Sequence, residues 1–335
     1  MKRIEWIDFA KSLMIFFIVL LHTHCNNVMV TMLNAIVMPM FFFMSGFLFS
    51  LKRNPSYIRF VYKRFRQLVV PYLWINLVAY FTWLFILRKY GNDAAESVEW
   101  YSPLLGITFG IPSELIHDIP LWSLLCFFIV EIIFYPLYKW VNKSLLISIF
   151  FIVIAGINNH IFGESMKQWP LCLAPLPASI AFYSFGYYMR NNDYKIVKQE
   201  IGNCFILLLL LLYVAASNMN GLTSFFTGYF GNYSLFLLSA FTGCFFIVQL
   251  CIIISDKTGD LKIIKFISNG TLLICGFHLL TLAFIKGILL FVFKIEPFNL
   301  TDNLLGGILF ALGAYVLCFP IIYIVRTYFR PLVDK

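Results

Sequence analysis

Two ionisable residues lie in the first long apolar stretch of the sequence, where charge is costly. Lys11 and His22 flank the run Ser-Leu-Met-Ile-Phe-Phe-Ile-Val-Leu-Leu. Ionisable groups inside a membrane segment are rare and usually functional, so the pair is a site hypothesis. At helical rise the stretch between them spans roughly 16 Å, about half of a bilayer's hydrocarbon core. We therefore expect this helix to carry a reaction from one side of the membrane towards the other.

Each of these residues also has a structural interpretation that involves no ligand. His22 could be an interface histidine bonded to a backbone carbonyl, and Lys11 a basic residue that snorkels to the membrane surface. Asp8 stands three residues before Lys11, so the two can pair on one helical face. His24 is two residues beyond His22 and points to a different face, so at most one of the two histidines shares a face with a given site.

A pair of small residues and a basic stretch come next. Ser45 and Gly46, near the end of the second apolar segment, let another helix or a ligand approach closely. The stretch 52–66 then holds six basic residues and no acidic one. As a loop it could set the topology or contact anionic lipid, or it could hold a polyphosphate through Arg64 and Arg66.

Two further ionisable residues lie deep in later apolar segments. Glu131 is about three turns into its segment, where a carboxyl group is expensive. It either bonds another helix in its protonated form or serves the site. His278 lies about mid-membrane. It either forms a hydrogen bond to another helix or is a second group of the site.

The composition predicts an all-α protein that crosses a membrane many times. Of 335 residues, 61% are hydrophobic and 12% are charged, about half the charged fraction of a soluble domain. We expect a single domain, residues 1–335, that forms a transmembrane bundle of about ten helices. The predicted segments are 7–25, 33–51, 68–88, 121–139, 144–160, 171–189, 203–219, 233–254, 270–293 and 304–326.

The basic residues predict the orientation of this bundle. Twenty of the 25 Lys and Arg residues fall at the termini and in one alternating set of connections, and four fall in the other set. Because cytoplasmic loops are enriched in basic residues, both termini are expected in the cytoplasm. The same distribution argues against nucleic acid as a partner. The eight cysteines are scattered without a Cys-x-x-Cys, so neither a disulfide framework nor a metal site is predicted.

The order of these motifs resembles the acyltransferase-3 family over nearly the whole chain. The pattern runs Asp8-x-x-Lys11-x10-His22, Pro39-Met-Phe-Phe-Phe-Met-Ser-Gly-Phe47, Lys63-Arg64-x6-Pro71-Tyr72, Leu121-Trp122-x-Leu124 and a late glycine followed by His278. The family comprises bacterial integral-membrane O-acyltransferases that act on cell-surface glycans. Lys11 stands where the family more often has Arg. With this Lys, the opening of the sequence is most similar to the family's fucose-4-O-acetylase-like branch. Ser123 departs from the pattern, which often has an aromatic residue there.

The resemblance implies a multi-pass enzyme of the bacterial inner membrane that transfers an acetyl group to a sugar hydroxyl. Acetyl-CoA from the cytoplasm would be the co-substrate, no cofactor would stay bound, and the acceptor would be a cell-surface or lipid-linked glycan. CoA phosphates would contact Lys11, Arg64 and Arg66. His22 would act as a general base or accept the acyl group covalently. The other residues expected to line the site are Asp8, Ser45, Tyr72, Trp122, Glu131 and His278.

A transporter is the competing hypothesis, for example a flippase of glycan intermediates whose charges line a path. Many transporters show inverted repeats and paired broken helices, and neither is evident in this sequence. A third hypothesis, a structural partner in a polysaccharide assembly complex, leaves the intramembrane charges unexplained. The sequence leaves a homo-oligomer open in every case.

The charge distribution makes a direct prediction about accessibility. Single cysteines introduced at Arg59 and Lys262 of a cysteine-free variant should not react with impermeant thiol reagents in intact cells, because both positions are expected in the cytoplasm. A cysteine at Glu99 should react, because it lies in a predicted outer connection. Labelling in permeabilised cells provides the control. The reverse pattern would overturn the orientation, and with it a cytoplasmic donor.

Overall fold

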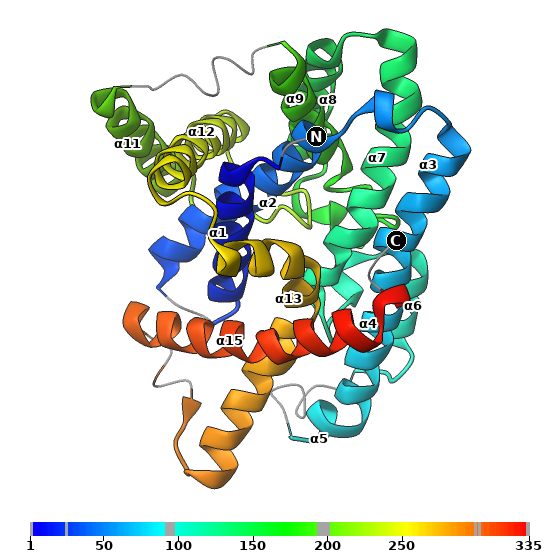
Figure 1. Cartoon of the computed structure of the whole chain (residues 1–335). Helices are drawn as coiled ribbons and strands as arrows, with labels where there is room; N and C mark the ends of the chain where they lie inside the picture. The colour runs from blue at the N-terminus through cyan, green and yellow to red at the C-terminus, as the bar shows by residue number, and fades with distance from the viewer. Residues whose placement is uncertain are drawn as a thin grey trace.

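The computed structural model is all-α and describes residues 3–23, 26–90, 98–192, 202–297, 300 and 303–332 (Figure 1). Its shorter helices are α3 (Tyr57–Arg64), α5 (Arg88–Tyr90) and α6 (Ser102–Phe109). The longer ones are α1 (Glu5–Leu21), α2 (Asn27–Leu48), α4 (Val70–Thr82), α7 (Trp122–Val141), α8 (Ser144–Ile161), α9 (Leu176–Asn191), α11 (Asn203–Asn220), α12 (Tyr233–Thr258), α13 (Lys262–Gly287) and α15 (Leu304–Tyr328).

Eight helical stretches in the described residues are long and apolar enough to cross a membrane. The prediction of an all-α, multi-pass membrane protein is therefore confirmed. Two of the ten predicted segments correspond to α1 and α9, which have 17 and 16 residues. A straight crossing takes about 20 residues, so these two helices are short for a full span. Both are rich in buried residues, which fits helices enclosed by the longer ones.

The basic stretch after α2 is largely helical and not the loop that the sequence suggested. α3 continues through a π-helical turn, Phe65–Val69, directly into α4, and a second such turn, Trp83–Leu87, leads to α5. Pro71 stands just after the first π-helical turn, inside the continuous helix, where a residue without an N–H interrupts the hydrogen-bond ladder. In Figure 1 α3 runs beside α7, and the two helices are in contact. The basic side chains of α3 are thereby held on a rigid element.

α1 lies in the middle of the bundle, in contact with α2, α12, α13 and α15 (Figure 1). Ser12 connects it to two of these neighbours. The Tyr315 hydroxyl of α15 donates to the Ser12 carbonyl at 3.0 Å, and the Ser12 hydroxyl lies 3.3 Å from the Ile264 carbonyl of α13. A helix that is apolar on all sides requires such surroundings. α1 is therefore well placed to present side chains to a site inside the bundle.

α2 and α9 approach each other backbone to backbone at two glycines. A Cβ atom at Gly46 would collide with the Tyr183 carbonyl of α9. A Cβ atom at Gly186 would collide with the Phe43 carbonyl of α2. Small residues let helices pack this closely in membranes, where dispersion and close packing drive association. The close approach predicted at Ser45-Gly46 is therefore made by a helix.

This contact predicts a large effect of Gly186→Val on folding. The added methyl groups would displace α9 from α2, because the obstructing atom is backbone and cannot rotate away. Overpacking of this kind typically costs about 1–3 kcal/mol or more. We expect a strong loss of the monodisperse peak in size-exclusion chromatography of the solubilised protein. Gly287→Val is the matched control, because a Cβ there would meet nothing within 4 Å. Equal behaviour of the two variants would contradict the prediction.

Candidate active site

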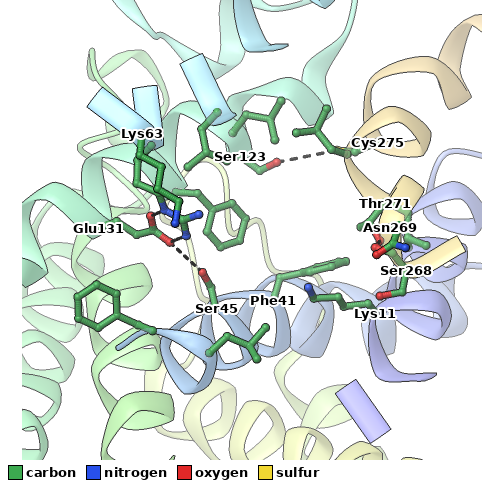
Figure 2. A pocket seen from close by; sticks show the side chains of 18 of the residues that line it. Lys11, Phe41, Ser45, Lys63, Ser123, Glu131, Ser268, Asn269, Thr271 and Cys275 are labelled. Atoms are coloured by element: carbon green, nitrogen blue, oxygen red, sulfur yellow. Dashed lines mark hydrogen bonds and ion pairs between the residues drawn. The ribbon is translucent and has the colours of Figure 1, made fainter. Parts of the chain in front are cut away.

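A cavity of about 430 Å³ lies between α1, α2, α3, α7 and α13 (Figure 2). We call it the inner cavity, after the predicted orientation. Its charged and polar lining residues are Lys11, Ser45, Ser50, Arg53, Asn54, Lys63, Arg64, Ser123, Glu131, Ser268, Asn269 and Thr271. Figure 2 shows the Lys11 amine between the group around Glu131 and the group of Ser268 and Asn269. Several cations and an apolar wall thus share one space, a combination that suits a phosphorylated ligand with a long uncharged arm.

Glu131 is held by the basic helix α3 across this cavity. Its carboxylate accepts two hydrogen bonds from the Arg64 guanidinium and one, at 3.2 Å, from the Ser45 hydroxyl. Arg64 also donates to the Gln67 amide oxygen at 2.9 Å. Glu131 is only 1% exposed, so the pair is compensated inside the protein. Arg64 therefore lines the cavity as predicted, but much of its hydrogen-bonding capacity is directed at Glu131.

Lys11 does not have the partner that the sequence suggested. Asp8 is engaged instead by Arg3, whose Nε lies 2.5 Å from Asp8 Oδ2, and by the Ser268 hydroxyl at 2.6 Å. The expected Asp8–Lys11 pairing is therefore wrong, because Arg3 forms a two-pronged contact that a lysine cannot match. Lys11 lines the inner cavity and makes no hydrogen bond or ion pair with another residue that the structure describes. Its ammonium group is thus available to an anionic ligand.

His22 and His278 meet at the other end of α1. The His22 Nδ1 lies 2.8 Å from the Ile18 carbonyl and 3.3 Å from the His278 Nε2. The His278 Nδ1 lies 2.9 Å from the carbonyls of Ile274 and Cys275. A carbonyl only accepts, so both Nδ1 atoms carry the proton and the His278 Nε2 is an acceptor. The lone pair of His22 is then at Nε2, the form that a general base requires.

His22 lines a second cavity, of about 450 Å³, at the opposite end of the bundle. We call it the outer cavity. It is formed where α1, α8 and α11 end and where α2 and α7 begin. Three residues, Ile18, Met38 and Ser123, line both cavities. We call these three the partition. The protein therefore presents a cationic cavity and a histidine-containing cavity that share three lining residues.

The remaining predicted residues occupy different places. Trp122 lines the outer cavity. Tyr72 is buried away from both cavities and donates to the Ile107 carbonyl at 2.9 Å, which makes it a packing residue. Arg66 lies in the π-helical turn after α3 and is not among the described residues that line the inner cavity. His24 lies outside the described residues.

The sequence reasoning did not assign the inner cavity's Lys63, Arg53 and Asn269. Lys63 and Arg64 are adjacent on α3, and both line the cavity together with Phe60. A helical interpretation of the basic stretch would have placed positions 60, 63 and 64 on one face. The sequence offers no comparable signal for Asn269.

A buried polar group precedes α7, outside both cavities. The Asn76 amide donates to the Tyr72 carbonyl at 2.8 Å, so its oxygen accepts from the His117 Nε2 at 2.9 Å. Burial lowers the pKa of His117 to about 4 and raises the pKa of Asp118 well above its usual value. His117 is therefore neutral near pH 7, and burial favours the neutral form of Asp118.

Fold and site together define a multi-pass membrane protein with two cavities that meet beside a buried histidine pair. The family model described as an acyltransferase domain matches residues 4–327, nearly the whole chain. The chain belongs to the acyltransferase-3 family and is an acyl-transfer enzyme. No curated protein and no solved structure matches it. The resemblance seen in the sequence is confirmed at this level, and the transporter and structural hypotheses are set aside.

The Arg64–Glu131 pair predicts a double-variant rescue. Arg64→Met should lower the melting temperature strongly, because it leaves the buried Glu131 carboxylate unpaired at a cost of about 3–5 kcal/mol. Glu131→Leu should lower it less, because the guanidinium that it leaves unpaired is partly exposed. The double variant should recover most of the loss, since no charge remains. Thermal unfolding in detergent measures this. Lys265→Ala, in an exposed pair with Asp260, is the control and should change little. Additive losses in the double variant would refute the pairing.

Proposed function

We propose that this enzyme transfers an acetyl group from cytoplasmic acetyl-CoA to a sugar hydroxyl of a cell-surface or lipid-linked glycan, in a bacterial inner membrane. One observation carries the proposal: α1 presents a cation to the inner cavity and a histidine to the outer one. The donor would enter the inner cavity and the acceptor the outer one. Residues 1–335 would act as one domain. Lys11, in place of Arg, supports the similarity to the fucose-4-O-acetylase-like branch.

The inner cavity supplies the means to hold the donor. Lys11, Lys63 and Arg53 line it and would attract the phosphates of CoA, while the charge of Arg64 is balanced by Glu131. The apolar wall, including Phe41 and Leu272, accommodates the uncharged pantetheine arm. Extended along α1, this arm would bring the thioester to the partition. Movement of the flexible Met38 would then expose the thioester to the outer cavity.

His22 is best suited to act as a general base. It lines the outer cavity and not the inner one, so it is nearer to the acceptor hydroxyl than to the donor phosphates. His22 Nε2 would take the hydroxyl proton as the oxygen attacks the thioester carbon. The carbon–sulfur bond then breaks, and the thiolate leaves and is protonated to give free CoA. His278 would be a positioning residue, because it accepts from the His22 Nδ1 and holds the ring.

The first test of this mechanism removes the base. His22→Ala should reduce transfer from labelled acetyl-CoA to glycan precursors about 100- to 10,000-fold in nanodiscs, the usual contribution of a general base. His278→Gln should lower the rate less and shift its pH profile. His160→Ala is the control, since His160 is exposed near the end of α8. Full activity of His22→Ala would refute the assignment. A labelled acetyl-enzyme lost in His22→Ala would indicate covalent transfer instead.

The second variant pair tests the donor site. Lys11→Met should raise the KM for acetyl-CoA about tenfold or more, because a charge-assisted contact contributes about 1.5–3 kcal/mol. Lys11→Arg should keep activity, since the cation is preserved. Lys286→Met is the matched control: this partly buried lysine of α13 is not among the described residues that line the inner cavity. An unchanged KM in Lys11→Met would remove Lys11 from the site.

A further inference from the structure

The connection between α11 and α12, residues 221–232, forms a hairpin over the outer cavity. Ser224 and Tyr229 form its closing bridge. Asn159 of α8 donates to the Gly231 carbonyl at 2.9 Å and accepts from the Phe230 N–H at 2.7 Å. These bonds tie the hairpin backbone to α8.

Two hydroxyl groups of this hairpin lack a partner in the described part of the chain. Thr223 is 4% exposed, and its Oγ1 and the Ser224 Oγ are both buried without a hydrogen bond there. Both residues line the outer cavity. Buried hydroxyls are nearly always satisfied by protein, water or ligand. The two hydroxyl oxygens lie just beneath the cavity surface, and rotation of their side chains would present both to a ligand rich in hydrogen-bonding groups.

The same cavity has an aromatic wall. The rings of Trp122 and Phe225 are stacked, with centroids 6.4 Å apart and an angle of 21° between their planes. Tyr229 and Phe226 also line the cavity. A sugar ring combines hydroxyl edges with apolar C–H faces, so aromatic rings next to hydroxyl groups match its two kinds of surface.

The charge of the residues that line the outer cavity favours neutral sugars over anionic ones. Glu164 is the one carboxylate among the described residues that line the outer cavity, and these residues include no Lys or Arg. An anionic sugar would lose hydration there without gaining a cation, and Glu164 would repel it. The inner cavity, lined by Lys11 and Lys63, has the opposite character.

We propose that the outer cavity binds the acceptor as an uncharged sugar unit, through Thr223, Ser224 and the aromatic wall, and that Glu164 disfavours anionic sugars. This inference rests on the proposed function, because it takes the outer cavity to be the acceptor side. It narrows the acceptor to glycans that present a neutral residue, in contrast to uronic or sialic acids. Recognition would then reside largely in one hairpin.

Direct binding tests this without relying on turnover. Methyl glycosides of glucose, galactose and mannose, each paired with the corresponding uronic acid, are compared by saturation-transfer NMR with the full chain in nanodiscs. At least one neutral glycoside should bind about tenfold more tightly than its uronic acid. Thr223→Val and Ser224→Ala should each weaken that binding about two- to tenfold, the effect of losing one neutral hydrogen bond. Glu164→Gln should reduce the difference in affinity between the neutral glycoside and its uronic acid.

Thr227→Val is the matched control and should bind like the parent protein. Thr227 lies in the same hairpin, but its hydroxyl donates to the Ser224 carbonyl at 3.1 Å and it does not line the outer cavity in the described residues. Equal binding within each pair, no binding at all, or unchanged binding by Thr223→Val would overturn the inference. Neutral-sugar binding without acetyl transfer would refute the proposed function and leave only a neutral-sugar site in the outer cavity. Acetyl transfer by a protein that binds neutral and anionic sugars equally well would refute the inference and leave the proposed function standing.

Discussion

An ionisable group inside a membrane bundle must find its counterpart within the protein, and this constraint organises the structure. Bulk water is not available at that depth, so an unpaired charge or hydrogen-bonding group is expensive. Glu131 is paired with Arg64, which ties α7 to α3. Asp8 is paired with Arg3 and accepts from α13. Against this background Lys11 is distinctive, since it points into a cavity without such a partner among the described residues.

Composition and charge were sufficient to predict the architecture. Long apolar runs correspond to helices because every backbone polar group in lipid must be satisfied within the chain. The isolated ionisable residues also lie at the candidate site: Lys11 and Glu131 line the inner cavity, and His22 meets His278 although 255 residues separate them in the sequence. Each of these residues is costly at its position, and that cost is visible in a sequence without any structure.

Other features depend on contacts between distant segments, which a single sequence does not reveal. Asp8 is three residues from Lys11 and yet bonds to Arg3, because the chain before α1 folds back onto it. The basic stretch predicts a loop from its sequence, since six cations in a short range are typical of one. It is helical because it packs on α7 and because Glu131 neutralises Arg64. The orphaned hydroxyls of the 221–232 hairpin are likewise evident only when their surroundings are known.

The partition has a consequence for the cell as a whole. An open channel between the inner and outer cavities would let protons and ions cross an energised membrane and dissipate its electrochemical gradient. Ile18, Met38 and Ser123 present mainly apolar atoms between the cavities, and such a layer is a poor conductor of ions. A thioester arm that displaces Met38 would itself fill the opening that it makes. Under the proposed function, the enzyme would pass a small acyl group across the bilayer while the membrane remains electrically sealed.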